Sequence, residues 1–160
     1  MKNKIEKVLI ALDYNPTVQK VAEAGSALAK SMGAEITLLH VMADPVYYSE
    51  TGYDPIMGYT GFTDIGPMKL NTNDALKKAS QQFLDKSKLH LGDKSIQTLV
   101  AEGDESEAIL KAAKHLHADV IVIGSHSRKW LENVLIGSVT EKVLRHTTIP
   151  LFIVPTKKGK

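Results

Sequence analysis

The chain has 160 residues, and 20 basic against 18 acidic side chains give a formal net charge of +2. This balance lacks the excess expected of a protein that follows a nucleic-acid backbone, so we expect no nucleic-acid partner. The chain contains no cysteine, which excludes disulfides, thiol catalysis and cysteine-bound zinc. The N-terminal apolar run is too short for a signal peptide or a membrane span, so we expect a cytoplasmic protein without a membrane partner. The length predicts one domain, residues 1–160.

The first part of the chain changes its apolar period repeatedly. Val8 to Leu12 is a continuous apolar run, typical of a strand covered on both faces of a parallel sheet. From Val18 to Met32 apolar residues recur every three or four positions, which predicts a helix that ends at Gly33. Ile36 to Val41 is the next predicted strand.

A long segment, residues 44–68, interrupts this alternation. It holds five of the nine aromatic residues of the chain and is predicted to be an insertion loop. Because it leaves from the end of a strand, it could act as a lid or as a partner-binding arm. The alternative is an insertion that makes no specific contact.

The second half continues the alternation of helices and strands. Asp104 and Glu107 have the spacing of a capping box at a helix start. Helices are predicted at residues 71–91, 104–116 and 138–146, and strands at 96–101, 120–123 and 150–154. Five strands alternating with four helices predict an α/β fold, a mostly parallel open sheet with helices on both faces.

A glycine-bearing motif follows the strand at 120–123. Gly124 to Ser127 forms a turn and the start of a short basic loop, and Gly137 to Thr140 stands at the start of a helix. A strand, a glycine turn and a helix start are how α/β proteins form a cradle for phosphate groups. The alternative is that Ser138 and Glu141 form a capping box that needs no ligand.

Three predicted site residues stand at the carboxyl ends of strands, where open α/β sheets bind ligands. Asp13, Val41 and Gly124 would face one crevice if their strands are neighbours. The alternative for Asp13 is a capping role at the following helix.

The order of these motifs resembles the universal stress protein family. Asp13 stands at the end of the first strand, nine residues separate Gly124 to Ser127 from Gly137 to Thr140, and the last strand ends at Val154. The resemblance implies a doubly wound, Rossmann-like sheet of order 3-2-1-4-5. In the nucleotide-binding branch it also implies ATP, with Mg or Mn, in the crevice.

The resemblance further implies a role for each matching residue. Asp13 would contact the ribose or the metal-phosphate region and so meet the metal only through the nucleotide, and the Val41 backbone would read the adenine edge. Gly124 would pass under the ribose and α-phosphate. The outer phosphates would be held by Gly137, Ser138, Val139 and Thr140.

One residue departs from the ATP-binding pattern of that family, because Ser127 stands where the pattern has its second glycine. If that position needs a positive φ, serine costs ~1 kcal/mol, or about fivefold in affinity. A hydroxyl that faces a phosphate would instead donate a hydrogen bond. Arg128 would add charge attraction or remain solvated, and His126 would shape the loop or meet a phosphate.

We therefore expect an ATP-binding universal stress protein that acts as a stress-response sensor or regulator, with slow or no hydrolysis. The resemblance implies a homodimer through the last strand, Leu151 to Val154. One alternative is a dimeric interaction module of the same family that binds no nucleotide. The other is a nucleotide-using enzyme, for which the sequence shows no evident nucleophile or catalytic carboxylate pair.

Overall fold

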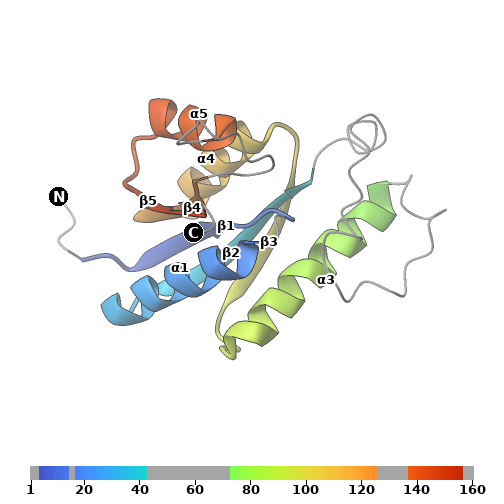
Figure 1. Cartoon of the computed structure of the whole chain (residues 1–160), viewed down its shortest axis with the longest axis horizontal. Coiled ribbons are helices and arrows are strands. Elements are labelled where there is room, and N and C mark those ends of the chain that lie inside the picture. Colours follow the sequence, from blue (N-terminus) through green and yellow to red (C-terminus); the bar gives the residue numbers. More distant parts are fainter. Residues whose placement is uncertain (1–3, 15–16, 43–72, 126–136, 157–160) are drawn as a thin grey trace.

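The computed structural model describes residues 4–14, 17–42, 73–125 and 137–156 (Figure 1). Five strands form a single sheet of order β3-β2-β1-β4-β5, in which every neighbouring pair is parallel. The strands are β1 (Lys7–Ala11), β2 (Glu35–Met42), β3 (Gln97–Glu102), β4 (Val120–Gly124) and β5 (Leu151–Val154). The expected α/β fold and strand order are confirmed. The expected insertion at 44–68 lies outside the described residues.

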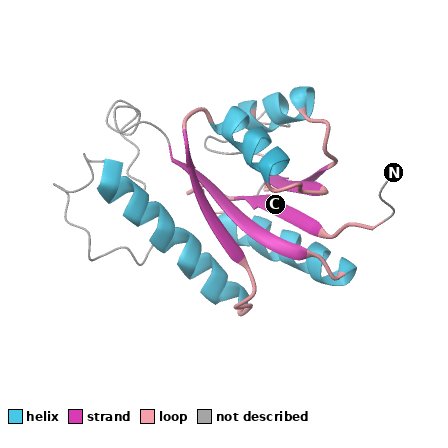
Figure 2. Cartoon of the chain, turned by 180° about the vertical axis from the view of Figure 1, so that it is seen from behind, coloured by secondary structure: helices cyan, strands magenta, loops and turns pink. Residues whose placement is uncertain are grey.

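Helices cover both faces of the sheet (Figures 1 and 2). They are α1 (Val18–Met32), α3 (Asn73–Leu91), α4 (Glu105–His115) and α5 (Ser138–His146). The two sides have separate hydrophobic cores, with α1 and α3 contributing to one and α4 and α5 to the other. Val8 and Ile10 point into the first core and Leu9 into the second, because successive side chains of a strand point to opposite faces.

Two of the predicted helix ends have the expected chemistry. Gly33 ends α1 in the left-handed conformation at φ 64°, which glycine adopts without steric cost. Asp104 caps α4, since its side chain accepts a hydrogen bond from the Glu107 N–H at 3.1 Å. These ends fix where the chain leaves one layer and enters the next.

Gly25 lets α1 approach the sheet closely. A Cβ atom at this position would lie 2.8 Å from Ile10 Cδ1 and 3.0 Å from Val122 Cγ1. Both neighbours are fully buried and have little room to move. We expect Gly25→Val to lower the free energy of unfolding by about 2 kcal/mol, a typical cost of overpacking.

Urea denaturation of Gly25→Val and of the control Ala27→Val measures this effect. Ala27 lies on the exposed face of the same helix, so the control carries only the helix-propensity cost of valine. Equal stability of the two variants would show that the close approach of α1 is not tight.

Candidate functional site

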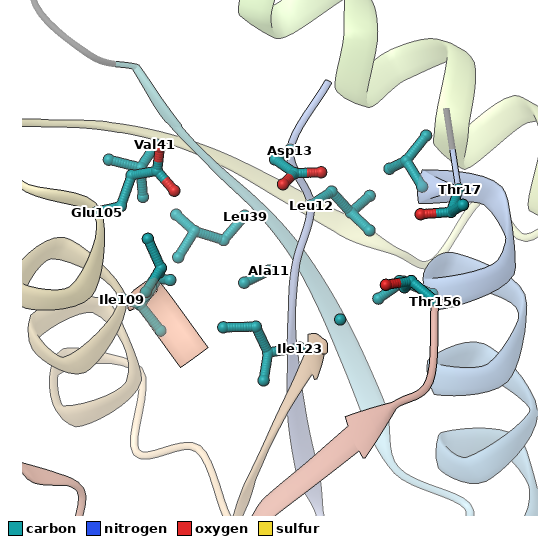
Figure 3. Close-up of a pocket in the computed structure, with 14 residues that line it drawn as sticks. Ala11, Leu12, Asp13, Thr17, Leu39, Val41, Glu105, Ile109, Ile123 and Thr156 are labelled. Atoms are coloured by element: carbon teal, nitrogen blue, oxygen red, sulfur yellow. The ribbon is translucent and has the colours of Figure 1, made fainter. Parts of the chain in front are cut away.

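A pocket opens at the carboxyl ends of the central strands, where ligands bind in open α/β sheets (Figure 3). About 500 Å³ within it is free of protein atoms, and part of this space is open solvent. Its walls include residues of α1, α4 and α5 and of β1, β2 and β4. The lining residues are Ala11, Leu12, Asp13, Thr17, Val18, Val21, Leu39, Val41, Glu105, Ile109, Ile123, Gly124, Val139 and Thr156.

Four of the residues singled out from the sequence line this pocket, namely Asp13, Val41, Gly124 and Val139. They meet because β1 lies between β2 and β4 in the sheet. The capping alternative for Asp13 is wrong, since α1 begins at Val18 with Thr17 as its N-cap residue. The carboxylate of Asp13 lines the pocket.

The β1–β2 ladder ends next to Val41, a buried residue that lines the pocket. The Leu12 N–H donates to the Leu39 carbonyl at 2.8 Å, and a regular ladder would continue from the Val41 N–H to the Leu12 carbonyl. That carbonyl instead accepts from His40 Nδ1 at 2.8 Å, which assigns the hydrogen to this nitrogen. Since alternate residues of a strand direct N–H and C=O to the same side, Val41 directs both toward β1 beyond the ladder's end.

Hydrogen bonds fasten the start of α5 to the end of β4. The Gly137 N–H donates to the Ser125 carbonyl at 2.6 Å, and the Thr140 hydroxyl donates to the Gly124 carbonyl at 2.7 Å. Thr140 is fully buried, so its hydroxyl serves this contact. The first turn of α5 therefore stands at a fixed place beside Gly124, with Val139 in the pocket wall.

The alternative interpretation of Ser138 and Glu141 as a capping box is wrong. Gly137 is the N-cap residue, with extended backbone at φ −68° and ψ 160°, and α5 makes no side-chain cap hydrogen bond. Ser138 is already the first helical residue and is exposed, so its hydroxyl does not occupy the capping position. His126, Ser127 and Arg128 lie outside the described residues.

Glu105 is a pocket residue that the sequence did not single out. It is the first residue of α4, and in Figure 3 it lies on the same side of the pocket as Val41. Burial, followed by the neighbouring Asp104 carboxylate, raises the pKa of Glu105 to about 7. The signal in the sequence is its i, i+4 spacing with Ile109, which places both side chains on one helix face.

Two threonines line the opposite side of the pocket. Figure 3 shows Thr17 and Thr156 across from Glu105, with Asp13 between the two sides. Thr156 is held by Ser125, whose hydroxyl accepts from the Thr156 N–H at 3.0 Å. This contact draws the chain after β5 against the end of β4.

Metal-ligating side chains are sparse in the described part of the chain. No three histidine, aspartate or glutamate residues there lie close enough together to hold a metal ion. The carboxyl groups that line the pocket are those of Asp13 and Glu105. No helix among residues 4–14, 17–42, 73–125 and 137–156 is long and apolar enough to cross a membrane.

Comparison with known proteins agrees with this arrangement of strands. The model of the universal stress protein family matches residues 4–155. The chain belongs to the universal stress protein family. Universal stress protein YxiE of Bacillus subtilis is 29% identical over 150 residues, which cover 92% of this chain and 97% of that protein.

Solved structures of universal stress proteins share the fold. Protein MJ0577 of Methanocaldococcus jannaschii has a TM-score of 0.72 at 23% identity, over 97% of this chain and 99% of that one. A universal stress protein in complex with cAMP has a TM-score of 0.63 at 17% identity, over 97% of this chain and 100% of that one. The family resemblance of the motifs is thus confirmed, as is the fold.

Proposed function

We propose that this universal stress protein binds an adenine nucleotide, ATP with Mg or Mn, in the pocket. The observation that carries the proposal is the Val41 main chain, which directs a donor and an acceptor past the end of the β1–β2 ladder. An adenine edge offers the complementary acceptor and donor. The apolar side chains of Leu39, Ile109 and Ile123 would contact the faces of a base.

The phosphates would lie toward Gly124 and the start of α5. The first N–H groups of a helix have no partner within the helix, and its dipole favours an anion there. Val139 in the pocket wall places this helix start next to the proposed ligand. In this proposal Ser138 and Val139 act through their main-chain N–H groups, Gly137 forms the turn, and Thr140 keeps it in place through Gly124. His126, Ser127 and Arg128 are proposed to complete the phosphate side.

The donors at the pocket fit a metal ion that arrives with the nucleotide. Mg²⁺ is usually bound by one or two carboxylates together with substrate phosphates and water. Asp13 would supply such a carboxylate, and the bound ion would neutralise phosphate charge. The described residues offer no dedicated cage of three ligands, which favours a nucleotide-bound ion over a resident one.

A role as a sensor or regulator suits this site better than rapid catalysis. Hydrolysis of ATP needs a positioned base or water-orienting group near the terminal phosphate. Two carboxyl groups of the described residues line the pocket. Asp13 lies next to Leu12 and Thr17, and Glu105 lies on the Val41 side. We therefore propose slow or no turnover, and a homodimer formed through β5 as the regulatory unit.

Titration calorimetry with Mg-ATP and Mg-GTP tests the binding proposal. We expect micromolar affinity for ATP, equivalent to about 8 kcal/mol, and at least tenfold weaker binding of GTP because its base edge reverses the donor and acceptor. Absence of both heat and thermal shift at millimolar ATP would overturn the proposal. Several turnovers per second would replace the regulator with an enzyme.

A further inference from the structure

The start of α4 places one carboxyl group in the pocket and turns its neighbour away. The Asp104 carboxylate accepts hydrogen bonds from the Ser106 hydroxyl at 2.7 Å and the Glu107 N–H at 3.1 Å. Asp104 is exposed and occupied with the helix cap. Glu105, the next residue, shares the pocket face of α4 with Ile109.

The pocket wall next to Glu105 includes apolar side chains. Val41, Leu39 and Ile109 line the pocket on the same side as Glu105 in Figure 3. A charged group is poorly solvated in such a place, and burial is the larger cause that raises the pKa of Glu105 to about 7. A protonated carboxyl group both donates and accepts a hydrogen bond, whereas a carboxylate only accepts.

We propose that Glu105 determines the base specificity of the pocket, because its carboxyl group pairs with adenine on the same side of the pocket as the Val41 main chain. This inference rests on the proposed nucleotide function and names the residue that selects the base. Glu105 would act by direct contact with the ligand, from the same side of the pocket as Val41.

The hydrogen-bonding pattern of the bases explains the selectivity. Next to its Watson–Crick edge, adenine presents the N7 acceptor and an N6 amino donor, and a neutral carboxyl group complements both. Guanine presents two acceptors there, N7 and O6, of which a carboxyl group can satisfy one. An ionised Glu105 could donate no hydrogen bond to N7 of either base. Its oxygen lone pairs would instead face the lone pair of N7.

Charged groups around Glu105 determine how this contact responds to pH. The Asp104 carboxylate at the start of α4 favours the neutral form of Glu105. The pKa of Asp104 itself is lowered mainly by hydrogen bonds from Ser106 and Glu107, and to a smaller extent by the charge of Lys142 on α5. Asp13 at the end of β1 adds a further carboxyl group to the pocket wall. Binding of adenine to the protonated form would raise the pKa of Glu105 further, so affinity should fall as pH rises through 7.

Adenosine is the probe that isolates the base contact, because it has no phosphate that titrates near neutrality. From pH 6 to pH 8 a group with a pKa of about 7 goes from about nine-tenths to about one-tenth protonated. We expect the unchanged protein to bind adenosine about tenfold more weakly at pH 8 than at pH 6. Calorimetry or competition against a fluorescent adenine nucleotide measures the change.

Two variants separate the contact from general charge effects. Glu105→Gln keeps a donor and an acceptor at all pH values, as glutamine does when it pairs with adenine N6 and N7, and should remove the pH dependence while retaining binding. Glu107→Gln removes the same formal charge from an exposed side chain on the same helix turn and should keep the tenfold pH dependence. Urea denaturation of both variants verifies that they are folded.

The outcomes distinguish the two proposals. If adenosine and ATP fail to bind to the unchanged protein, the nucleotide function and the role of Glu105 both fall. If they bind, but Glu105→Gln shows the same pH dependence as the unchanged protein, only the assignment of Glu105 is overturned. A pH effect that appears with ATP and not with adenosine would also overturn it, since Glu105 would then act on phosphate charge.

Discussion

Replacing Ala11 with phenylalanine is expected to abolish nucleotide binding while the domain stays folded. Ala11 lies in the floor of the pocket, and Figure 3 shows it between Leu39 and Ile123. Its small side chain leaves the space in which a base would lie. A phenyl ring there would take the place of the base, and we expect affinity for ATP to fall by more than about a hundredfold, the loss of about 3 kcal/mol.

The fold should tolerate Ala11→Phe because the new ring enters existing space. Ala11 is only half-buried, unlike its fully buried neighbour Ile10, so its substitution does not overpack the core. The free energy of unfolding should stay within about 1 kcal/mol of the original or increase through apolar burial. Ala27→Phe, on the exposed face of α1, is the matched control and should keep full ATP affinity. Undiminished ATP binding by Ala11→Phe would place the nucleotide outside this pocket.

The apolar pattern predicts the elements of this fold because each buried strand needs cover on both faces. The predicted strand Val8 to Leu12 differs from the observed β1 by one residue at each end. The next strand, predicted to end at Val41, extends in the structure to Met42. Such shifts arise because strand ends are defined by hydrogen bonds to neighbours. The ladder between β2 and β3, for example, continues to Met42 opposite Glu102, and no local pattern records that pairing.

The candidate site was only partly predictable for the same reason. The strand order that brings Asp13, Val41 and Gly124 together came from the family resemblance, because periodicity alone does not order strands. The contact between His40 and Leu12 joins residues 28 positions apart and is invisible to a local reading. Glu105 was missed because glutamate in the first turn of a helix normally interacts with the dipole and stays solvated. Its place in a pocket depends on where β2 ends.

The edge strand β5 offers a surface for a second copy of the chain. It pairs with β4 on one side, and Pro150 and Val154 direct their carbonyls to that strand. By alternation, Leu151 and Ile153 direct N–H and C=O to the outer edge. An edge of this kind favours pairing with another strand, and a two-fold axis would join two identical edges.

Phe152 is the side chain through which this proposed dimer can be tested without damage to the core. Leu151 and Ile153 pack against the α4 and α5 core, so a charge at either would destabilise the monomer itself. Phe152 is 39% exposed on the opposite face of the strand. We expect Phe152→Lys to weaken dimerisation by at least about a hundredfold, because burial of the ring is lost and two like charges meet near the axis.

Sedimentation at tens of micromolar protein measures the result, with Leu89→Lys as the matched control. Leu89 is 81% exposed on α3, which Figure 1 places on the far side of the molecule from β5, so this variant should remain dimeric. Phe152→Lys should sediment as a monomer and still bind ATP, since the described residues of a single chain already form the pocket. A monomeric unchanged protein would refute the β5 dimer, and a dimeric Phe152→Lys would locate the interface elsewhere. Loss of ATP binding on conversion to the monomer would instead show that the site needs the second copy.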